Sequence, residues 1–226
     1  VEAGELKVSP TVRGCIYPLR SNAFEVRNCT FENNTNEEGT SAGIFAWQPT
    51  ELFIDGCSFR NNLASSSTCM YIDQRDLESG DPSALVRIQN CTFEENTNPG
   101  GFSAGLYFWQ PKKLELVGSD FLNNQAGNAA GIYIDQRDVA PDVNSILIDS
   151  CLFQGNETTD YGGSGIYFWN GNFTITNTQF INNSAPSAAP AIYMGGDEDN
   201  GSIVNCEFTG NNASFAGAIA NYNGLS

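Results

Sequence analysis

The sequence predicts an all-β fold, a right-handed single-stranded parallel β-helix of about seven or eight coils with three short strands in each coil. One observation is a motif in which Phe is followed three residues later by Asn, found at Phe31, Phe59, Phe93, Phe121, Phe153, Phe180 and Phe208. Successive motifs lie 27 to 34 residues apart, which is the length of one coil with variable loops. Apolar and polar residues also alternate before each motif, as is typical of a strand.

The first expected strand of each coil lies just before the motif. Apolar residues stand seven and five positions before the phenylalanine, at Phe24/Val26, Leu52/Ile54, Val86/Ile88, Leu114/Leu116, Ile146/Ile148 and Phe173/Ile175. Three positions before each Phe comes Asn, Gly or Ser, residues that tolerate a left-handed turn. The next residue is always small, and we expect it to lie inside the coil: Cys29, Cys57, Cys91, Ser119, Cys151, Thr178 and Cys206.

The asparagines of the motif are expected to form an inward ladder. They are Asn34, Asn62, Asn96, Asn124, Asn156, Asn183 and Asn211. Stacked coils place like residues about 4.8 Å apart, so each amide can bond to the next coil.

A third strand then carries Ile44, Met70, Leu106, Ile132, Ile166, Ile192 and Ile219. We expect residues 1–226 to form one domain, with residues 1–23 as an N-terminal partial coil or cap and repeats from about residue 24.

The outward column of the third strand is largely aromatic. Because side chains alternate along a strand, the residues one and three positions after each aliphatic residue should face solvent. We call their aromatic members the aromatic strip: Phe45, Trp47, Tyr71, Tyr107, Trp109, Tyr133, Tyr167, Trp169 and Tyr193. The same alternation predicts that the small residues before the aliphatic position, Gly43, Gly105, Gly131 and Gly165, also point outward.

Two types of coil alternate along the strip. At the same position of successive coils, tryptophan alternates with Asp73, Asp135 or Gly195. This alternation indicates a super-repeat of two coils, about 60 residues long. The strip has two readings. It either stabilises the sheet by stacking between coils, or it is a docking surface for a polysaccharide, a protein or a neighbouring copy.

Composition narrows the function. The chain has 26 acidic residues, 10 basic residues and no histidine, so we expect no nucleic-acid partner and none of the histidine-dependent nucleophiles or zinc sites. No apolar run approaches the roughly 20 residues of a membrane helix. Seven cysteines leave at least one thiol unpaired within the chain. Buried free thiols, or a bridge from Cys57 to Cys29 or Cys91, remain alternatives.

Asn-x-Ser/Thr triplets suit a secreted or cell-surface protein if the source glycosylates them. They occur at Asn28, Asn33, Asn90, Asn156, Asn172, Asn182, Asn200 and Asn212.

The sequence Asp-Gln-Arg-Asp occurs twice and offers carboxylates at Asp73, Asp76, Asp135 and Asp138. An internal Arg–Asp ion pair that fixes the loop is one reading. The other is a calcium site, because Ca²⁺ takes six to eight oxygen ligands. Calcium is the one cofactor that the sequence suggests.

Two features resemble a known family: the Phe-x-x-Asn motif in every coil, and three small residues before an aliphatic one at 41–44, 103–106, 129–132 and 216–219. Together they resemble the repeats of the polymorphic outer membrane proteins. That likeness covers the chain from Cys15 onward and implies a surface adhesin. Pectin-degrading lyases share the pectate-lyase-like solenoid, so a calcium-dependent polysaccharide lyase with Arg75 or Arg137 as its base is the alternative.

We therefore expect a non-catalytic structural or adhesive module that is extracellular or at the cell surface. Its partner would be a glycan, a protein or further copies in a filament. The duplicated loop and the absence of histidine argue against an enzyme.

Overall fold

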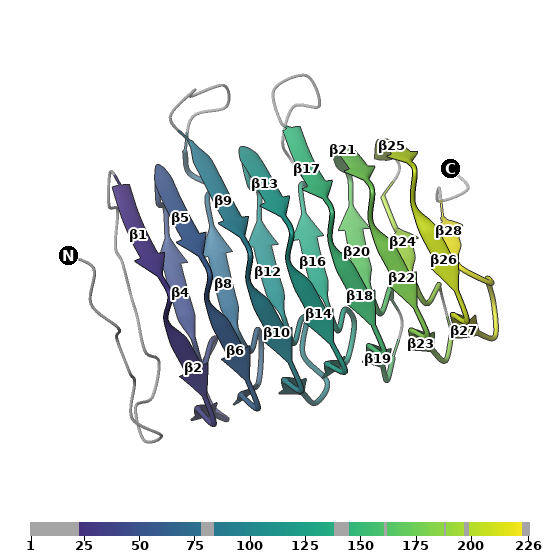
Figure 1. The fold of residues 1–226 in the computed structure, drawn as a ribbon, viewed down its shortest axis with the longest axis horizontal. Helices are drawn as coiled ribbons and strands as arrows, with labels where there is room; N and C mark the ends of the chain where they lie inside the picture. The colour runs from purple at the N-terminus through teal and green to yellow at the C-terminus, as the bar shows by residue number, and fades with distance from the viewer. Residues whose placement is uncertain are drawn as a thin grey trace.

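The computed structural model describes residues 23–77, 84–137, 145–160, 162–187, 189–196 and 199–222. These residues form parallel strands arranged in four sheets that run the length of a solenoid (Figure 1). No helix long and apolar enough to span a membrane occurs among them. The expected cap at residues 1–23 lies almost wholly outside this description.

The first sheet contains β1 (Ala23–Arg27), β5 (Glu51–Asp55), β9 (Leu85–Gln89), β13 (Lys113–Val117), β17 (Ser145–Asp149), β21 (Gly171–Thr176) and β25 (Asp199–Val204). The second sheet contains β2 (Thr30–Glu32), β6 (Ser58–Arg60), β10 (Thr92–Glu94), β14 (Asp120–Leu122), β18 (Leu152–Gln154), β22 (Gln179–Ile181) and β26 (Glu207–Thr209).

The third sheet contains β3 (Thr35–Asn36), β7 (Leu63–Ala64), β11 (Thr97–Asn98), β15 (Gln125–Ala126), β19 (Glu157–Thr158), β23 (Ser184–Ala185) and β27 (Asn212–Ala213). The fourth sheet contains β4 (Ile44–Trp47), β8 (Met70–Asp73), β12 (Leu106–Trp109), β16 (Ile132–Asp135), β20 (Ile166–Trp169), β24 (Ile192–Met194) and β28 (Ile219–Asn221).

Each coil thus has four strands rather than the expected three. The additional strand is the two-residue strand of the third sheet, directly after the ladder asparagine. It forms because the asparagine carbonyl accepts the first amide of that strand in the following coil: Leu63 N donates to Asn34 O at 2.9 Å, and Thr97 N donates to Asn62 O at 2.9 Å.

The coils stack in register, as the motif predicts. Phe121 pairs with Phe93 on one side and with Phe153 on the other. The rings of the phenylalanine column lie nearly parallel, with adjacent centroids 4.5 to 5.0 Å apart. The first six are fully buried and belong to one core that also contains the apolar residues of the first and fourth sheets.

The expected asparagine ladder is confirmed. At Asn96, for example, the backbone N and the side-chain Nδ2 both donate to Asn124 Oδ1 at 3.0 Å, and Nδ2 also donates to Phe59 O. The same pattern repeats at the neighbouring ladder positions. Each interior amide of the ladder, from Asn62 to Asn183, therefore joins three consecutive coils.

The expected left-handed turn before the motif is also present. The residues at this position all have a positive φ between 50° and 60°: Asn28, Gly56, Asn90, Gly118, Ser150, Asn177 and Asn205. Asparagine and glycine tolerate this conformation at little cost.

The glycines before the fourth sheet face inward, which corrects the expected outward position of Gly43, Gly105, Gly131 and Gly165. A Cβ built on Gly131 would lie 2.9 Å from the Phe153 ring and would clash with the carbonyl of Gly165. Strand alternation cannot be extended back through these positions because the backbone bends there, just before β16 and its equivalents. Small residues occupy this position, glycine in these four coils and Cys69 or Ala191 in others, because the phenylalanine column fills the adjacent space.

Candidate functional site

Four of the five tyrosines of the aromatic strip are buried, which corrects their expected exposure. Tyr71, Tyr107, Tyr133 and Tyr167 are 2 to 8% exposed, and their rings stack with adjacent centroids 4.6 to 5.1 Å apart. They form a cluster separate from the interior core, so they do point outward. Phe102, in the loop between the third and fourth sheets, lies over Tyr107 and Tyr133. Burial raises the pKa of all four hydroxyls.

The remaining strip residues stay partly accessible: Phe45, Trp47, Trp109, Trp169 and Tyr193. Of the predicted binding residues, only these can meet a partner without movement of the chain. The tryptophans lie at the ends of β4, β12 and β20, and two of them, Trp109 and Trp169, pack against the tyrosine cluster. The accessible part of the strip is therefore this tryptophan column, together with Phe45 and Tyr193.

Arginines from the alternate coils stack on the tryptophans. The guanidinium of Arg75 stacks 5.1 Å from the Trp47 ring and 4.5 Å from the Trp109 ring. Its Nη2 lies 2.9 Å from Asp73 Oδ2, and that carboxylate is fully buried. Burial raises the pKa of Asp73, and the bonds to Arg75 oppose this shift. Stacking on indole faces and pairing with a buried carboxylate both favour arginine over lysine.

Arg137 repeats the ion pair two coils later, but it stacks on one indole rather than two. It lies 4.8 Å from the Trp169 ring, and its Nη2 is 2.6 Å from Asp135 Oδ2. The hydrogen bonds to Asp135 raise the pKa of Arg137. The internal Arg–Asp pairing that the sequence suggested is thus present in both copies of the motif.

A groove runs along this column between Trp109 and Trp169. Its volume is about 440 Å³, and it is lined by Trp109, Gln110, Asp135, Arg137, Trp169, Asn170, Gly195 and Gly196. In the register of the fourth sheet, Gly195 stands where Asp73 and Asp135 stand in earlier coils. Two indoles, two side-chain amides and an Arg–Asp pair therefore meet on one concave surface.

The carboxylates proposed for calcium are already engaged. Asp73 and Asp135 pair with arginines, and Asp76 accepts a hydrogen bond of 2.5 Å from Gln48 Nε2. Asp138 lies outside the described residues. Within those residues, no three acidic or cysteine side chains gather as a metal site would require. Calcium binding stays a prediction.

The glycosylation candidates differ in accessibility. Asn156 is a fully buried member of the ladder, so its side chain cannot be modified in the folded chain. Asn172 is half-buried, and the other six are exposed: Asn28, Asn33, Asn90, Asn182, Asn200 and Asn212.

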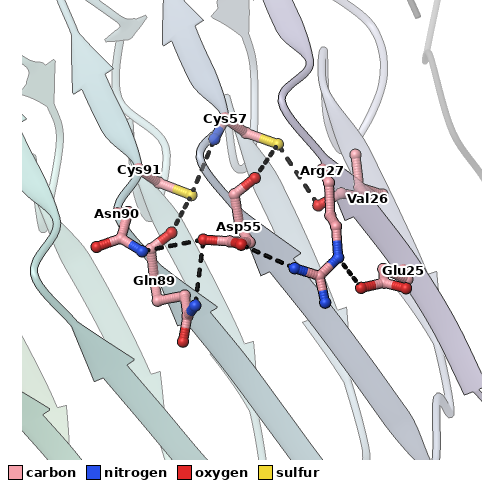
Figure 2. Close-up of polar contacts among 8 residues, drawn as sticks. All are labelled: Glu25, Val26, Arg27, Asp55, Cys57, Gln89, Asn90 and Cys91. Carbon is pink, nitrogen blue, oxygen red and sulfur yellow. Dashed lines mark hydrogen bonds and ion pairs between the residues drawn. The ribbon is translucent and has the colours of Figure 1, made fainter. Parts of the chain in front are cut away.

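One column has a role that the sequence did not reveal. The small residue two positions before each Phe donates from its γ atom to the carbonyl two residues earlier, as Cys91 Sγ does to Gln89 O at 3.1 Å (Figure 2). It also accepts from the preceding coil, where Cys57 N donates to Cys91 Sγ at 3.4 Å. Ser119 makes both bonds with its hydroxyl. Cysteine, serine and threonine can all make these two bonds with their γ atoms. This shared hydrogen-bonding capacity is the sequence signal from which the role of the column could have been inferred.

The six described cysteines are free thiols, and five of them are buried; Cys15 lies outside the described residues. The side-chain contact between Cys57 and Cys91 lowers the pKa of Cys57 to about 7 and raises that of Cys91. Next to this pair, Asp55 accepts bonds from Arg27, Gln89 and Asn90 (Figure 2). These side chains bridge coils on the outer face of the first sheet.

Comparisons with known proteins bear on the family. The profile of the right-handed β-helix region matches residues 14–144 and 104–225, so the two matches together span nearly the whole chain. No curated protein and no solved structure gives a significant match. Because the profile covers most of the sequence and the coils stack in four parallel sheets, the chain belongs to the right-handed β-helix family.

Proposed function

We propose that this chain is a non-catalytic β-helical module, extracellular or at the cell surface, that binds a neutral glycan in the groove between Trp109 and Trp169. The observation that carries the proposal is the concave surface where these indoles meet the side chains of Gln110, Asn170 and the Arg137–Asp135 pair. It is a binding surface rather than a bare hydrophobic patch.

The chemistry of this groove suits sugars. The apolar C–H face of a pyranose packs on an indole ring, while its hydroxyls need nearby donors and acceptors. Gln110 and Asn170 offer amides that both donate and accept. The net charge of −16 disfavours polyanionic chains through long-range repulsion. A neutral polysaccharide fits these features better than a uronate or a sulfated glycan.

Two features support a location outside the cell. Six glycosylation candidates are exposed, so the fold could carry glycans at these positions. The repeat also resembles that of polymorphic outer membrane proteins, whose passengers act as adhesins. A rod of stacked coils presents its groove at a fixed distance from whatever anchors it.

The arginines argue against a lyase. A general base must give up its proton near neutral pH, yet the bonds to Asp135 raise the pKa of Arg137. Arg75 is enclosed by two indoles and paired with a buried carboxylate. Both side chains are held as permanent cations with structural partners.

Binding can be tested by titrating neutral oligosaccharides into the protein in a calorimeter, after a glycan array has selected the best ligand. Trp169→Ala should weaken binding at least about tenfold, as expected when a stacking contact is lost. Trp47→Ala is the matched control, because it lies in the same column and stacks on Arg75 but does not line the groove. Equal losses in both variants, or no neutral glycan bound, would refute the proposal.

The non-catalytic role has its own test. Polygalacturonate incubated with the protein and calcium should release no unsaturated product. Turnover that disappears in Arg137→Ala would overturn the assignment in favour of a lyase.

A further inference from the structure

The fourth sheet repeats one arrangement at three points: a tryptophan at the end of a strand, an amide side chain directly after it, and the facing residues of the next coil. We call this arrangement a Trp–amide unit. The three units are Trp47 with Gln48, Trp109 with Gln110 and Trp169 with Asn170. The amide residue has a positive φ in each unit, 51°, 50° and 61°, so the chain turns in the same way after each tryptophan.

The chain itself fills the first unit. Arg75 of the next coil lies 5.1 Å from the centroid of the Trp47 ring. The second unit differs, because Arg137 of its next coil stacks on Trp169 instead of Trp109. Within the described residues, the one cation stacked on Trp109 is Arg75, which reaches it from the preceding coil. The side of Trp109 that faces the next coil is therefore left for a ligand.

The third unit is open because two glycines face it. Gly195 N donates to Phe168 O at 2.9 Å, which places Gly195 opposite Trp169 in the next coil. Neither Gly195 nor Gly196 has a side chain that could cover the indole. The groove is lined by residues of the second and third units and by none of the first. It therefore consists of two open units.

Two coil spacings separate the open units. In the register of β12, β16 and β20 (Figure 1), Trp109 lies opposite Asp135, and Asp135 lies opposite Trp169. At about 4.8 Å per coil, equivalent backbone positions of the two units are about 9.6 Å apart along the solenoid. One residue of an extended β-1,4-linked pyranose chain advances by nearly one coil spacing. Residues i and i+2 of such a chain would reach both units.

The two indoles are turned relative to each other. The ring plane of Trp109 lies at 74° to that of Tyr107, whereas the plane of Trp169 lies at 17° to that of Tyr167. Between these two tyrosines the stacked rings differ by only 24° and 6°, so the indole planes cannot be parallel. A flat ribbon, in which residues i and i+2 face the same way, cannot stack fully on both indoles. A chain that twists from residue to residue can.

We infer that the groove binds a single β-1,4-linked chain in a twisted conformation, such as xylan adopts, with residues i and i+2 on Trp109 and Trp169. This inference rests on the proposed function and adds the linkage, the shape and a minimum length of three residues. Gln110 Nε2 donates to Arg137 O at 2.7 Å, so its oxygen can accept from a sugar hydroxyl, and Asn170 offers an amide to the other ring. An uncharged xylan backbone also suits the net charge of −16.

Calorimetric titration with xylo-oligosaccharides of two to six residues tests the spacing. Xylotriose should bind at least about tenfold more tightly than xylobiose, because it is the shortest chain that stacks on both indoles. Longer chains should add little. Xylohexaose should bind more tightly than cellohexaose, which forms a flatter ribbon, and than maltohexaose, which coils. Microcrystalline cellulose, a surface of flat ribbons, should not retain the protein.

Substitutions locate the two contacts. Trp109→Ala and Trp169→Ala should each weaken xylotriose binding at least about tenfold. Trp47→Ala is the matched control and should leave binding unchanged, because Arg75 already fills its unit. Trp109→Phe keeps an aromatic ring against the tyrosine cluster and so guards against a folding defect. It should still weaken xylotriose binding while the circular dichroism spectrum stays unchanged.

The outcomes separate this inference from the proposed function. If no neutral oligosaccharide binds, both fail. If cellohexaose or maltohexaose binds as tightly as xylohexaose, or xylobiose as tightly as xylotriose, the twisted two-unit arrangement is overturned while glycan binding in the groove stands. A loss confined to Trp169→Ala would overturn it as well, because one unit would then be sufficient.

Discussion

Asn124→Ala should destabilise the solenoid by about 4 kcal/mol, because the side chain makes four hydrogen bonds, each with a net value of about 1 kcal/mol. It donates to Phe93 O at 2.9 Å and to Asn156 Oδ1 at 3.0 Å. It accepts from Asn96 N and from Asn96 Nδ2, both at 3.0 Å. Asn124 is fully buried, so water cannot replace these partners.

The assay is urea unfolding followed by circular dichroism and by tryptophan fluorescence. With a slope of about 3 kcal/mol/M for a chain of this size, the midpoint should fall by about 1.3 M. The two probes must agree, because solenoids can lose cooperativity between distant coils.

Gln125→Ala is the control, since Gln125 is an exposed amide side chain directly after Asn124. It should change stability by no more than about 0.5 kcal/mol. If Asn124→Ala costs as little as Gln125→Ala, the ladder does not contribute in the way that its geometry indicates, and the register of the coils must be maintained by the apolar columns alone.

Three further predictions concern individual residues of the coils. Cys91→Ala should lower the free energy of unfolding, measured with urea, by about 1 kcal/mol. Cys91→Ser should lower it less, because a hydroxyl can make both γ-atom bonds. Equal losses in the two variants would contradict that role of the γ atom. After secretion from a glycosylating host, mass spectrometry should find Asn156 unmodified while Asn182 can carry a glycan; glycan on Asn156 of the folded chain would contradict its burial. Maleimide at pH 8 should label Cys206 well before Cys151, because burial raises the pKa of Cys151 to about 12 and keeps it protonated; equal rates would show that the coils open.

The packing of the interior could be predicted from the sequence because the same interior residues recur in every coil. Phe31 and Phe208 lie at opposite ends of the described coils, yet both sit in the same column of stacked rings. A repeat identifies stacked positions directly, since like residues can lie above one another only if the coils are in register. The two-residue strand was missed because two residues show no alternation, and its pairing depends on the carbonyl of the preceding asparagine.

The outer face could not be predicted in the same way. Alternation placed Tyr107 outward, but exposure depends on what lies over a side chain. Phe102 covers it from a loop that carries no repeat signal of its own. Likewise, the sequence suggested an Arg–Asp pair without indicating that Arg75 also lies between two indoles, because those indoles belong to the coils on either side.

The two-coil super-repeat has a physical cause in this arrangement. Arg75 lies 5.1 and 4.5 Å from the rings of Trp47 and Trp109, and these distances together match two coil spacings of about 4.8 Å each. Tryptophan in every coil would leave no room for a guanidinium between the rings, so arginine and tryptophan must alternate.

This alternation ends after Trp169, because Gly195 takes the place of the aspartate that would anchor the next arginine. The Trp169 ring therefore lies at the point where the internal stack is interrupted, and the groove occurs at the same point. A ligand with a flat apolar face would continue the stack that the chain itself leaves incomplete. For this reason Trp169, rather than the chemically identical Trp47, should carry the binding energy.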